Sequence, residues 1–166
     1  MSESLKVHRF LHKVDDGIFK AELVIGVSLT VVMVAAVFLQ VVFRYVVNQP
    51  LSWSEELARY VFVWASMLGA SMGVKKKTHF GLDALIKLFP HPQKKTIEIV
   101  LYCLMSVFLI ILVYYGTKFS SELYVQTAPG LNVTMAIPYA AIPVGGLLML
   151  CHILLMLFVQ SADRER

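Results

Sequence analysis

The chain carries, from Leu23 to Phe43, the uncharged run LVIGVSLTVVMVAAVFLQVVF. Its only polar side chains are those of Ser28, Thr30 and Gln40. A helix of about 20 apolar residues spans the hydrocarbon core of a bilayer, so the run predicts a first transmembrane helix over about residues 22–45. The run is longer than the apolar part of a cleavable signal peptide, and we expect it to stay attached as a membrane anchor.

Three further apolar runs predict three more spanning helices. They cover about residues 53–74, 97–118 and 133–159. Before the second helix, Asn48-Gln49-Pro50 is typical of a turn. Ser52 and Glu55 follow with the spacing of a capping box, in which both side chains bind free backbone N–H groups. In the fourth helix, Pro143 cannot donate to the carbonyl of Tyr139, so we expect a bend in its outer part.

The composition agrees with four membrane-spanning helices. Hydrophobic residues make up 58% of the 166 residues and charged residues 16%, whereas a soluble domain carries about 25% charged residues. The basic residues lie in segments beside the apolar runs, which favours anionic lipid headgroups over nucleic acid as their partners. The sequence therefore predicts an all-α integral membrane protein in which residues 1–166 form a single membrane domain.

The basic residues are distributed unequally between the two sides of the predicted spans. Twelve of the 15 Lys and Arg residues lie on the side of the chain termini: Lys6, Arg9, Lys13, Lys20, Lys75, Lys76, Lys77, Lys87, Lys94, Lys95, Arg164 and Arg166. Arg44, Arg59 and Lys118 lie on the other side. Because segments rich in Lys and Arg stay in the cytoplasm, both termini are predicted to be cytoplasmic.

Two basic amphipathic stretches, near residues 5–20 and 80–90, are predicted to be helices that lie on the membrane. Their apolar positions recur at helical spacing: Val7, Phe10, Leu11, Val14 and Ile18 in the first, and Leu82, Leu85, Ile86 and Phe89 in the second. Such helices lie in the headgroup layer of the inner leaflet. Lys75-Lys76-Lys77, directly after the second span, is likewise predicted to bind lipid headgroups.

The sequence contains no pattern that indicates a catalytic, cofactor or metal site. The middle of each predicted span is free of Asp, Glu, Lys and Arg, and a charge there costs at least about 2.5–3.5 kcal/mol. This disfavours an independent small four-helix exporter or exchanger, which is kept as the alternative function. Cys103 and Cys151 do not form a Cys-x-x-Cys pair. His152 has no second histidine at membrane depth to share a haem, and we interpret it as hydrogen-bonded between helices. The chain is not expected to be an enzyme.

The stretch Trp53-Ser54-Glu55-Glu56-Leu57-Ala58-Arg59 combines an aromatic ring with opposite charges. A tryptophan ring is favoured at headgroup level. Glu55 and Glu56 lie four and three residues before Arg59, so either carboxylate can pair with it on one helical face. One interpretation is a capped helix start with an aromatic anchor. The other is a desolvated pair to Arg59, with the remaining carboxylate turned toward a partner protein.

Small residues recur at every fourth position on two predicted helices. Ala65, Gly69 and Gly73 form such a row on the second helix, and Ala141 and Gly145 form one on the fourth. These rows let helix backbones approach closely in lipid. Packing within the chain is the simpler interpretation, and a seam for another subunit is the alternative.

Together these features resemble the small membrane subunit of tripartite ATP-independent periplasmic (TRAP) transporters. The resemblance rests on Arg44-Tyr45, on Pro50 to Tyr60 with Phe62-Val63-Trp64, and on Lys77-Thr78-His79 before Asp83, and it covers roughly residues 15–160. It implies a family motif and candidate subunit interface made of Arg44, Trp53, Glu55, Glu56, Arg59, His79 and Asp83.

The resemblance also implies a function. TRAP transporters import organic acids across the bacterial inner membrane, driven by a sodium gradient. A periplasmic substrate-binding protein captures the acid, and a large elevator-type membrane subunit holds the substrate and sodium sites. The small subunit braces the large one and has no substrate site. Its expected partners are these two proteins and membrane phospholipids, without a cofactor. Sialic acid and C4-dicarboxylates are both cargo of the family. We lean to sialic acid, although no residue of this chain supports that choice.

Overall fold

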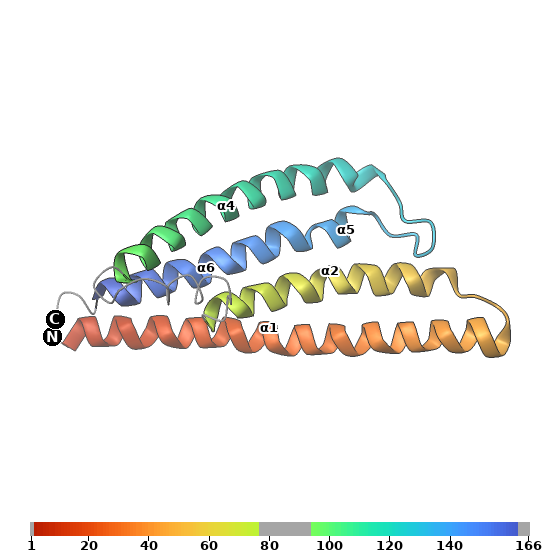
Figure 1. The fold of residues 1–166 in the computed structure, drawn as a ribbon, viewed down its shortest axis with the longest axis horizontal. Coiled ribbons are helices and arrows are strands. Elements are labelled where there is room, and N and C mark those ends of the chain that lie inside the picture. The colour runs from red at the N-terminus through yellow and green to blue at the C-terminus, as the bar shows by residue number, and fades with distance from the viewer. Residues whose placement is uncertain (1, 77–93, 163–166) are drawn as a thin grey trace.

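The computed structural model of the chain describes residues 2–76 and 94–162, which are mainly helical (Figure 1). Its elements are α1 (Ser2–Val42), the π-helical η1 (Phe43–Val47), α2 (Ser52–Lys75), α4 (Lys94–Glu122), the 3-10 helix η2 (Leu123–Val125), α5 (Ala136–Tyr139) and α6 (Ala141–Ala162). Among the described residues, four helical segments are long and apolar enough to cross a membrane. The predicted all-α class with four spanning helices is confirmed.

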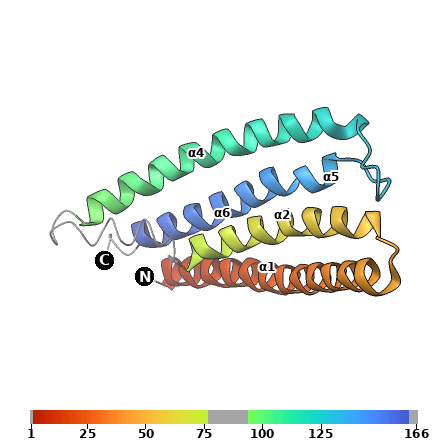
Figure 2. The ribbon, with the colours of Figure 1, turned by 45° about the vertical axis from the view of Figure 1, so that its right-hand side comes forward.

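The four long helices stand side by side in a row, in the order α1, α2, α6 and α4 (Figures 1 and 2). α2 packs against both α1 and α6, and α4 packs against α6. α1 and α4 therefore form the two edges of the row. Only 11% of the most apolar stretch of each edge helix is buried, so most apolar side chains of these two helices face outward.

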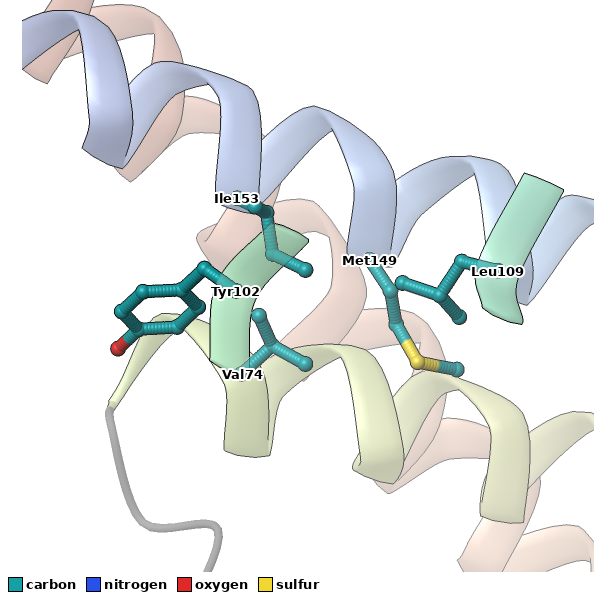
Figure 3. Packing of buried hydrophobic residues seen from close by; sticks show 5 residues of the cluster. All are labelled: Val74, Tyr102, Leu109, Met149 and Ile153. Carbon is teal, nitrogen blue, oxygen red and sulfur yellow. The ribbon is translucent and has the colours of Figure 1, made fainter. Parts of the chain in front are cut away.

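The main apolar core lies where α2, α4 and α6 meet. It consists of Val74, Tyr102, Leu109, Met149 and Ile153 (Figure 3). Leu109 and Ile153 are 2% and 0% exposed. Because lipid tails are as apolar as these side chains, close packing rather than removal from water holds the three helices together here.

Glycines on α6 let this helix fit between two neighbours. A Cβ added at Gly145 would lie 2.7 Å from Met67 Cβ on α2, and one added at Gly146 would lie 2.8 Å from Val113 Cγ2 on α4. Ala141, one turn before Gly145, is completely buried. The row of small residues predicted on the fourth helix therefore packs within the chain.

The row Ala65, Gly69 and Gly73 on α2 has different surroundings. A Cβ added at Gly69 or Gly73 would meet nothing within 4 Å. Gly69 is exposed, whereas Ala65 and Gly73 are half-buried. Among the described residues no neighbouring helix approaches the two glycines closely, so the interpretation of this row as an internal packing seam is wrong for them.

The described basic residues separate into two groups along the row. Arg9, Lys13 and Lys20 on α1, Lys75 at the end of α2 and Lys76 directly after it lie toward the end where α1 starts and α6 finishes. We call this the basic end (Figure 1). Arg44, Arg59 and Lys118 lie toward the opposite end, which we call the loop end, near the connecting segments 43–51 and 123–135. The side of the membrane on which each end lies stays a prediction.

α1 is longer than the predicted first span. It is a single helix of 41 residues, which corresponds to about 62 Å and is about twice the thickness of a hydrocarbon core. Residues 5–20 are helical as predicted, but they form the first part of this helix rather than a separate one, and their placement on the membrane surface stays a prediction. The second predicted amphipathic helix, near residues 80–90, lies outside the described residues.

The fourth predicted span begins later and is broken. Residues 133–135 belong to the end of a loop, where Met135 donates its N–H to the carbonyl oxygen of Gln126 at 2.8 Å. The helix is interrupted at Ala140, between α5 and α6. Pro143 has no N–H to bind the carbonyl of Tyr139, which agrees with this interruption, and the bend expected in the outer part of the helix stays a prediction.

Candidate functional sites at the two ends of the helix row

The start of α2 is not closed by the predicted capping box. The N-cap residue is Leu51, and it makes no side-chain cap hydrogen bond. Ser54, which is completely buried, donates its hydroxyl to the carbonyl oxygen of Leu51 at 2.8 Å. Glu55 pairs with Arg59. The hydroxyl of Ser54 therefore fixes the first turn. Glu55, the glutamate of the predicted capping box, is paired with Arg59 instead.

Glu55 and Arg59 form the predicted i, i+4 ion pair, with 3.0 Å between Glu55 Oε1 and Arg59 Nη2. The two side chains are 66% and 67% exposed. An exposed pair contributes about 0–1 kcal/mol to folding, and its charges are not desolvated by the described part of the chain. The pair therefore remains available to a partner, and its own contribution to folding is small.

Glu56 does not join this pair but holds a distant loop. Its Oε2 accepts hydrogen bonds from the backbone N–H groups of Gly130 at 2.8 Å and Leu131 at 2.9 Å. Its Oε1 accepts from the hydroxyl of Tyr60 at 2.8 Å. The expectation that the second carboxylate faces a partner is therefore wrong, because both oxygens are bonded within the chain.

The loop passes so close to Glu56 that it needs a glycine. A Cβ added at Gly130 would lie 2.7 Å from Glu56 Oε2 and 3.2 Å from the backbone oxygen of Ser52. Beside this contact is a polar hollow of about 350 Å³, lined by Ser52, Glu55, Glu56, Arg59, Pro129 and Gly130. The hollow therefore lies at the centre of the predicted family motif, at the loop end. Nothing in the sequence indicated that the loop containing Gly130 lies beside this motif.

The remaining motif residues are only partly brought together. Trp53 follows Ser52, which lines the hollow, and is 37% exposed. The guanidinium carbon of Arg44 lies 5.8 Å from the centre of the Tyr45 ring. His79 and Asp83 lie outside the described residues.

The lysines at the end of α2 differ from the predicted headgroup-binding run. Lys75 Nζ lies 2.7 Å from Asp16 Oδ1 and 3.2 Å from Asp15 Oδ2, and its side chain is only 15% exposed. Lys75 therefore joins α2 to α1, where a lipid contact was expected. Lys76 is exposed, with its Nζ 5.2 Å from the centre of the Phe19 ring, and Lys77 lies outside the described residues.

A buried polar cluster joins α1, α2 and α6 beside this ion pair. Ser71 Oγ donates to Glu22 Oε1 at 2.7 Å. His152 Nε2 lies 3.2 Å from Glu22 Oε2, and His152 Nδ1 lies 2.5 Å from Asp15 Oδ1. Glu22, Ser71 and His152 are 3%, 0% and 2% exposed. The interpretation of His152 as hydrogen-bonded between helices is confirmed. We call Asp15, Glu22, Ser71, Lys75 and His152 the Glu22 cluster.

Sequence reasoning did not single out Glu22, which comes directly before the apolar run. One signal was available: Asp15 and Glu22 are seven residues apart and so share a helix face. Their partners could not be inferred, since Ser71 and His152 are 49 and 130 residues from Glu22. Among the described residues no three His, Cys, Asp or Glu side chains are placed to hold a metal ion.

Comparison with known proteins links the chain to one family. It matches the family model described as "Tripartite ATP-independent periplasmic transporters, DctQ component" over residues 33–163. It is 31% identical over 132 residues to the sialic acid TRAP transporter permease protein SiaT of Haemophilus influenzae, covering 79% of this chain and 21% of that protein. It is 32% identical over 110 residues to the C4-dicarboxylate TRAP transporter small permease protein DctQ of Rhodobacter capsulatus, covering 65% and 48%.

A third relative is the isethionate TRAP transporter permease protein DctMQ of Oleidesulfovibrio alaskensis, 30% identical over 104 residues, with 61% of this chain and 16% of that protein covered. The chain thus spans less than half the length of each of these three relatives. The family model takes in α2, α4 and α6 and the end of α1, which is more than half of the chain. The chain therefore belongs to the DctQ component family of tripartite ATP-independent periplasmic transporters and is a multi-pass protein of the inner membrane.

Proposed function

We propose that this chain is the small permease subunit of a sodium-driven TRAP transporter that imports an organic acid of the sialic acid or C4-dicarboxylate type. It holds a large elevator-type subunit in the bilayer and has no substrate site of its own. The observation that supports this most directly is the open row of helices. A row offers a wide flank to a neighbour, whereas a compact bundle of four helices offers a narrow one.

The outward surfaces of the row are apolar on both edge helices. Exposed large side chains include Val31, Val34 and Phe38 on α1, and Leu104, Phe108 and Ile111 on α4. In a bilayer such surfaces are neutral toward lipid and become a binding surface only where a partner packs closely. A brace of this kind therefore binds by shape, through many apolar contacts and few hydrogen bonds.

The lengths of the relatives support a large membrane partner. The matched segment makes up only 21% of the Haemophilus permease and 16% of the Oleidesulfovibrio permease. In those proteins a segment like this chain is therefore covalently joined to a much longer remainder. Where the remainder is a separate polypeptide, the small subunit binds that polypeptide as its large partner.

The row Ala65, Gly69 and Gly73 is our candidate for the closest contact with the large subunit. A Cβ added at either glycine would meet no atom within 4 Å in the described chain. A partner helix can approach the backbone of α2 there without meeting a side chain. The polar hollow beside Glu55 and Arg59 is the candidate contact for the periplasmic substrate-binding protein, because we place the loop end in the periplasm.

The placement of the loop end rests on the basic residues. In the sequence, twelve of the 15 Lys and Arg residues fall before the first predicted span, between the second and third, or after the fourth, and cytoplasmic segments of membrane proteins carry such an excess. With the basic end in the cytoplasm, the start of α2 and the loop that contains Gly130 face the periplasm. Lys76 then lies at the level of the inner-leaflet phospholipids.

A buried carboxylate is the feature that an independent exchanger would need, and Glu22 is one. Its two oxygens, however, face Ser71 and His152, which leaves no oxygen turned toward a solute. Transport assays separate the two functions. Liposomes that contain this chain alone should take up no organic acid. Liposomes that also contain the large subunit and the binding protein should take it up when a sodium gradient is applied. Uptake by the chain alone would establish the exchanger and refute the brace.

Co-purification from native membranes tests the partners. The chain should bring down one large membrane protein and, in the presence of substrate, one periplasmic protein. The bound acid in the recovered periplasmic protein then identifies the cargo. Recovery of this chain without any large membrane protein, under mild detergent conditions, would contradict the proposed assembly.

A further inference from the structure

The Glu22 cluster contains more hydrogen-bond acceptors than ordinary protonation states can serve. A carboxylate only accepts hydrogen bonds, and a neutral imidazole has one N–H and one lone pair. In the cluster, both ring nitrogens of His152 face carboxylate oxygens, at 2.5 Å for Asp15 and 3.2 Å for Glu22. With a neutral ring and two ionised carboxylates, one nitrogen lone pair would point at an oxygen lone pair.

We propose that the Glu22 cluster is a proton-binding site that joins α1 to α6 and holds one proton more than a neutral histidine and two ionised carboxylates. The proton lies either on the imidazole, which then donates from both nitrogens, or on Glu22, which then donates to His152 Nε2. In both forms each of the short contacts has one donor and one acceptor. The site is separate from the predicted family motif at the loop end.

The charges around the site favour this extra proton. Lys75 lies within 3.2 Å of Asp15 and 2.7 Å of Asp16, so it serves these two carboxylates. Among the described residues no cation pairs with Glu22, which is 3% exposed. An ionised carboxylate is costly to bury without an opposite charge. A proton on His152 supplies that charge, and a proton on Glu22 removes the need for it.

The neighbouring elements place no other cation against His152 within the described residues. α1 contributes Asp15, Asp16 and Glu22, α2 contributes Lys75 with its ammonium on the aspartates, and α6 contributes the half-buried thiol of Cys151. On the side of α4, Ile153 points into the apolar core toward Tyr102 (Figure 3). His152 is therefore directed toward α1, and its two carboxylate neighbours dominate its surroundings.

The proposal predicts the sign of a pH dependence. Above about pH 6.5 an exposed histidine has lost its proton, and an exposed glutamate has lost its proton above about pH 4.3. Over this range the folded chain binds a proton that the unfolded chain has released. Stability therefore falls as the pH rises, and the apparent unfolding constant grows by up to tenfold per pH unit for one linked proton.

Reversible unfolding of the full chain in mixed micelles, measured over a series of pH values above about pH 6.5, tests this sign. Glu22→Gln is the informative variant. Its amide oxygen accepts from Ser71, and its amide N–H donates to a neutral His152, so no extra proton is needed. We expect the wild-type slope to disappear in Glu22→Gln and to remain in Glu55→Gln, a matched control at an exposed glutamate at the loop end. Equal slopes in wild type and Glu22→Gln would refute the proposal.

Spectroscopy gives an answer that does not depend on the stability of the variants. Nitrogen NMR of wild-type protein with labelled histidines should show, at about pH 8, one imidazole with both nitrogens protonated, where an ordinary histidine is neutral. If the proton is on Glu22, an infrared band of a protonated carboxyl should appear instead and vanish in Glu22→Gln. Folded protein that shows neither signal would overturn the proposal.

Discussion

The carboxylate of Glu56 lies 2.8 Å from the backbone nitrogen of Gly130, which is 74 residues further along the chain. The same oxygen also accepts from Leu131. One side chain at the start of α2 thus fixes the loop between η2 and α5. Glu56 was predicted to belong to a partner-binding motif, and in the structure its carboxylate supports the neighbouring loop.

Replacing Glu56 with alanine should lower the free energy of unfolding by about 1.5–3 kcal/mol, because hydrogen bonds to a charged group are lost. Glu55→Ala is the matched control and should change it by about 0–1 kcal/mol, since its pair with Arg59 is exposed. Both values are measured by reversible unfolding in mixed micelles. Equal effects of the two substitutions would mean that Glu56 does not hold the loop.

A methyl group at position 130 should displace the loop. In Gly130→Ala the new Cβ would come within 2.7 Å of Glu56 Oε2 and 3.2 Å of a backbone oxygen, and overpacking of this kind costs about 1–3 kcal/mol. Limited proteolysis between η2 and α5 should become faster than in the wild-type chain. Unchanged proteolysis and stability would show that the loop moves away at little cost.

The fold class could be predicted because a membrane span depends on a local property, the length of an apolar run. The continuity of α1 was missed for a related reason. The polar composition of residues 5–20 differs from that of Leu23 to Phe43, but no proline separates them, and the helix continues from one into the other. A change of composition marks a change of surroundings and need not mark a helix end.

The side-chain contacts at the sites were less predictable. The pair of Glu55 and Arg59 follows from helical spacing, and the structure contains it. The partners of Glu56 and Glu22 depend on which helices are neighbours, and the order α1, α2, α6, α4 differs from the order in the chain (Figure 2). No local pattern encodes that order, so the loop contact and the buried cluster emerge only from the structure.

The proposed orientation predicts a cytoplasmic C-terminus. A reporter enzyme that is active only in the periplasm, fused after Arg166, should be inactive, because the basic end carries most of the Lys and Arg residues. The same reporter inserted in the loop at Pro129 should be active. The reverse pattern would place the loop end in the cytoplasm and exclude contact with a periplasmic protein there.

Arg59→Ala separates a role in folding from a role in assembly. The exposed pair contributes about 0–1 kcal/mol, so the purified variant should unfold almost as the wild type does. If the guanidinium becomes desolvated against a partner, removing it leaves a charge without its counterpart, and recovery of the complex and uptake by cells should fall. Arg59→Lys should restore only part of both, because lysine lacks the planar fork. Wild-type recovery and uptake in Arg59→Ala would limit this residue to the surface pair.

Two glycines in neighbouring helices distinguish packing within the chain from packing against the large subunit. Gly145→Ala should destabilise the purified chain by about 1–3 kcal/mol, because its Cβ would lie 2.7 Å from Met67 Cβ. Gly69→Leu should leave the purified chain folded, since nothing lies within 4 Å of a Cβ there. In membranes that contain the whole transporter, Gly69→Leu should reduce co-purification of the large subunit, because a bulky side chain would then occupy the seam. Unchanged recovery of the complex would show that this face of α2 meets lipid.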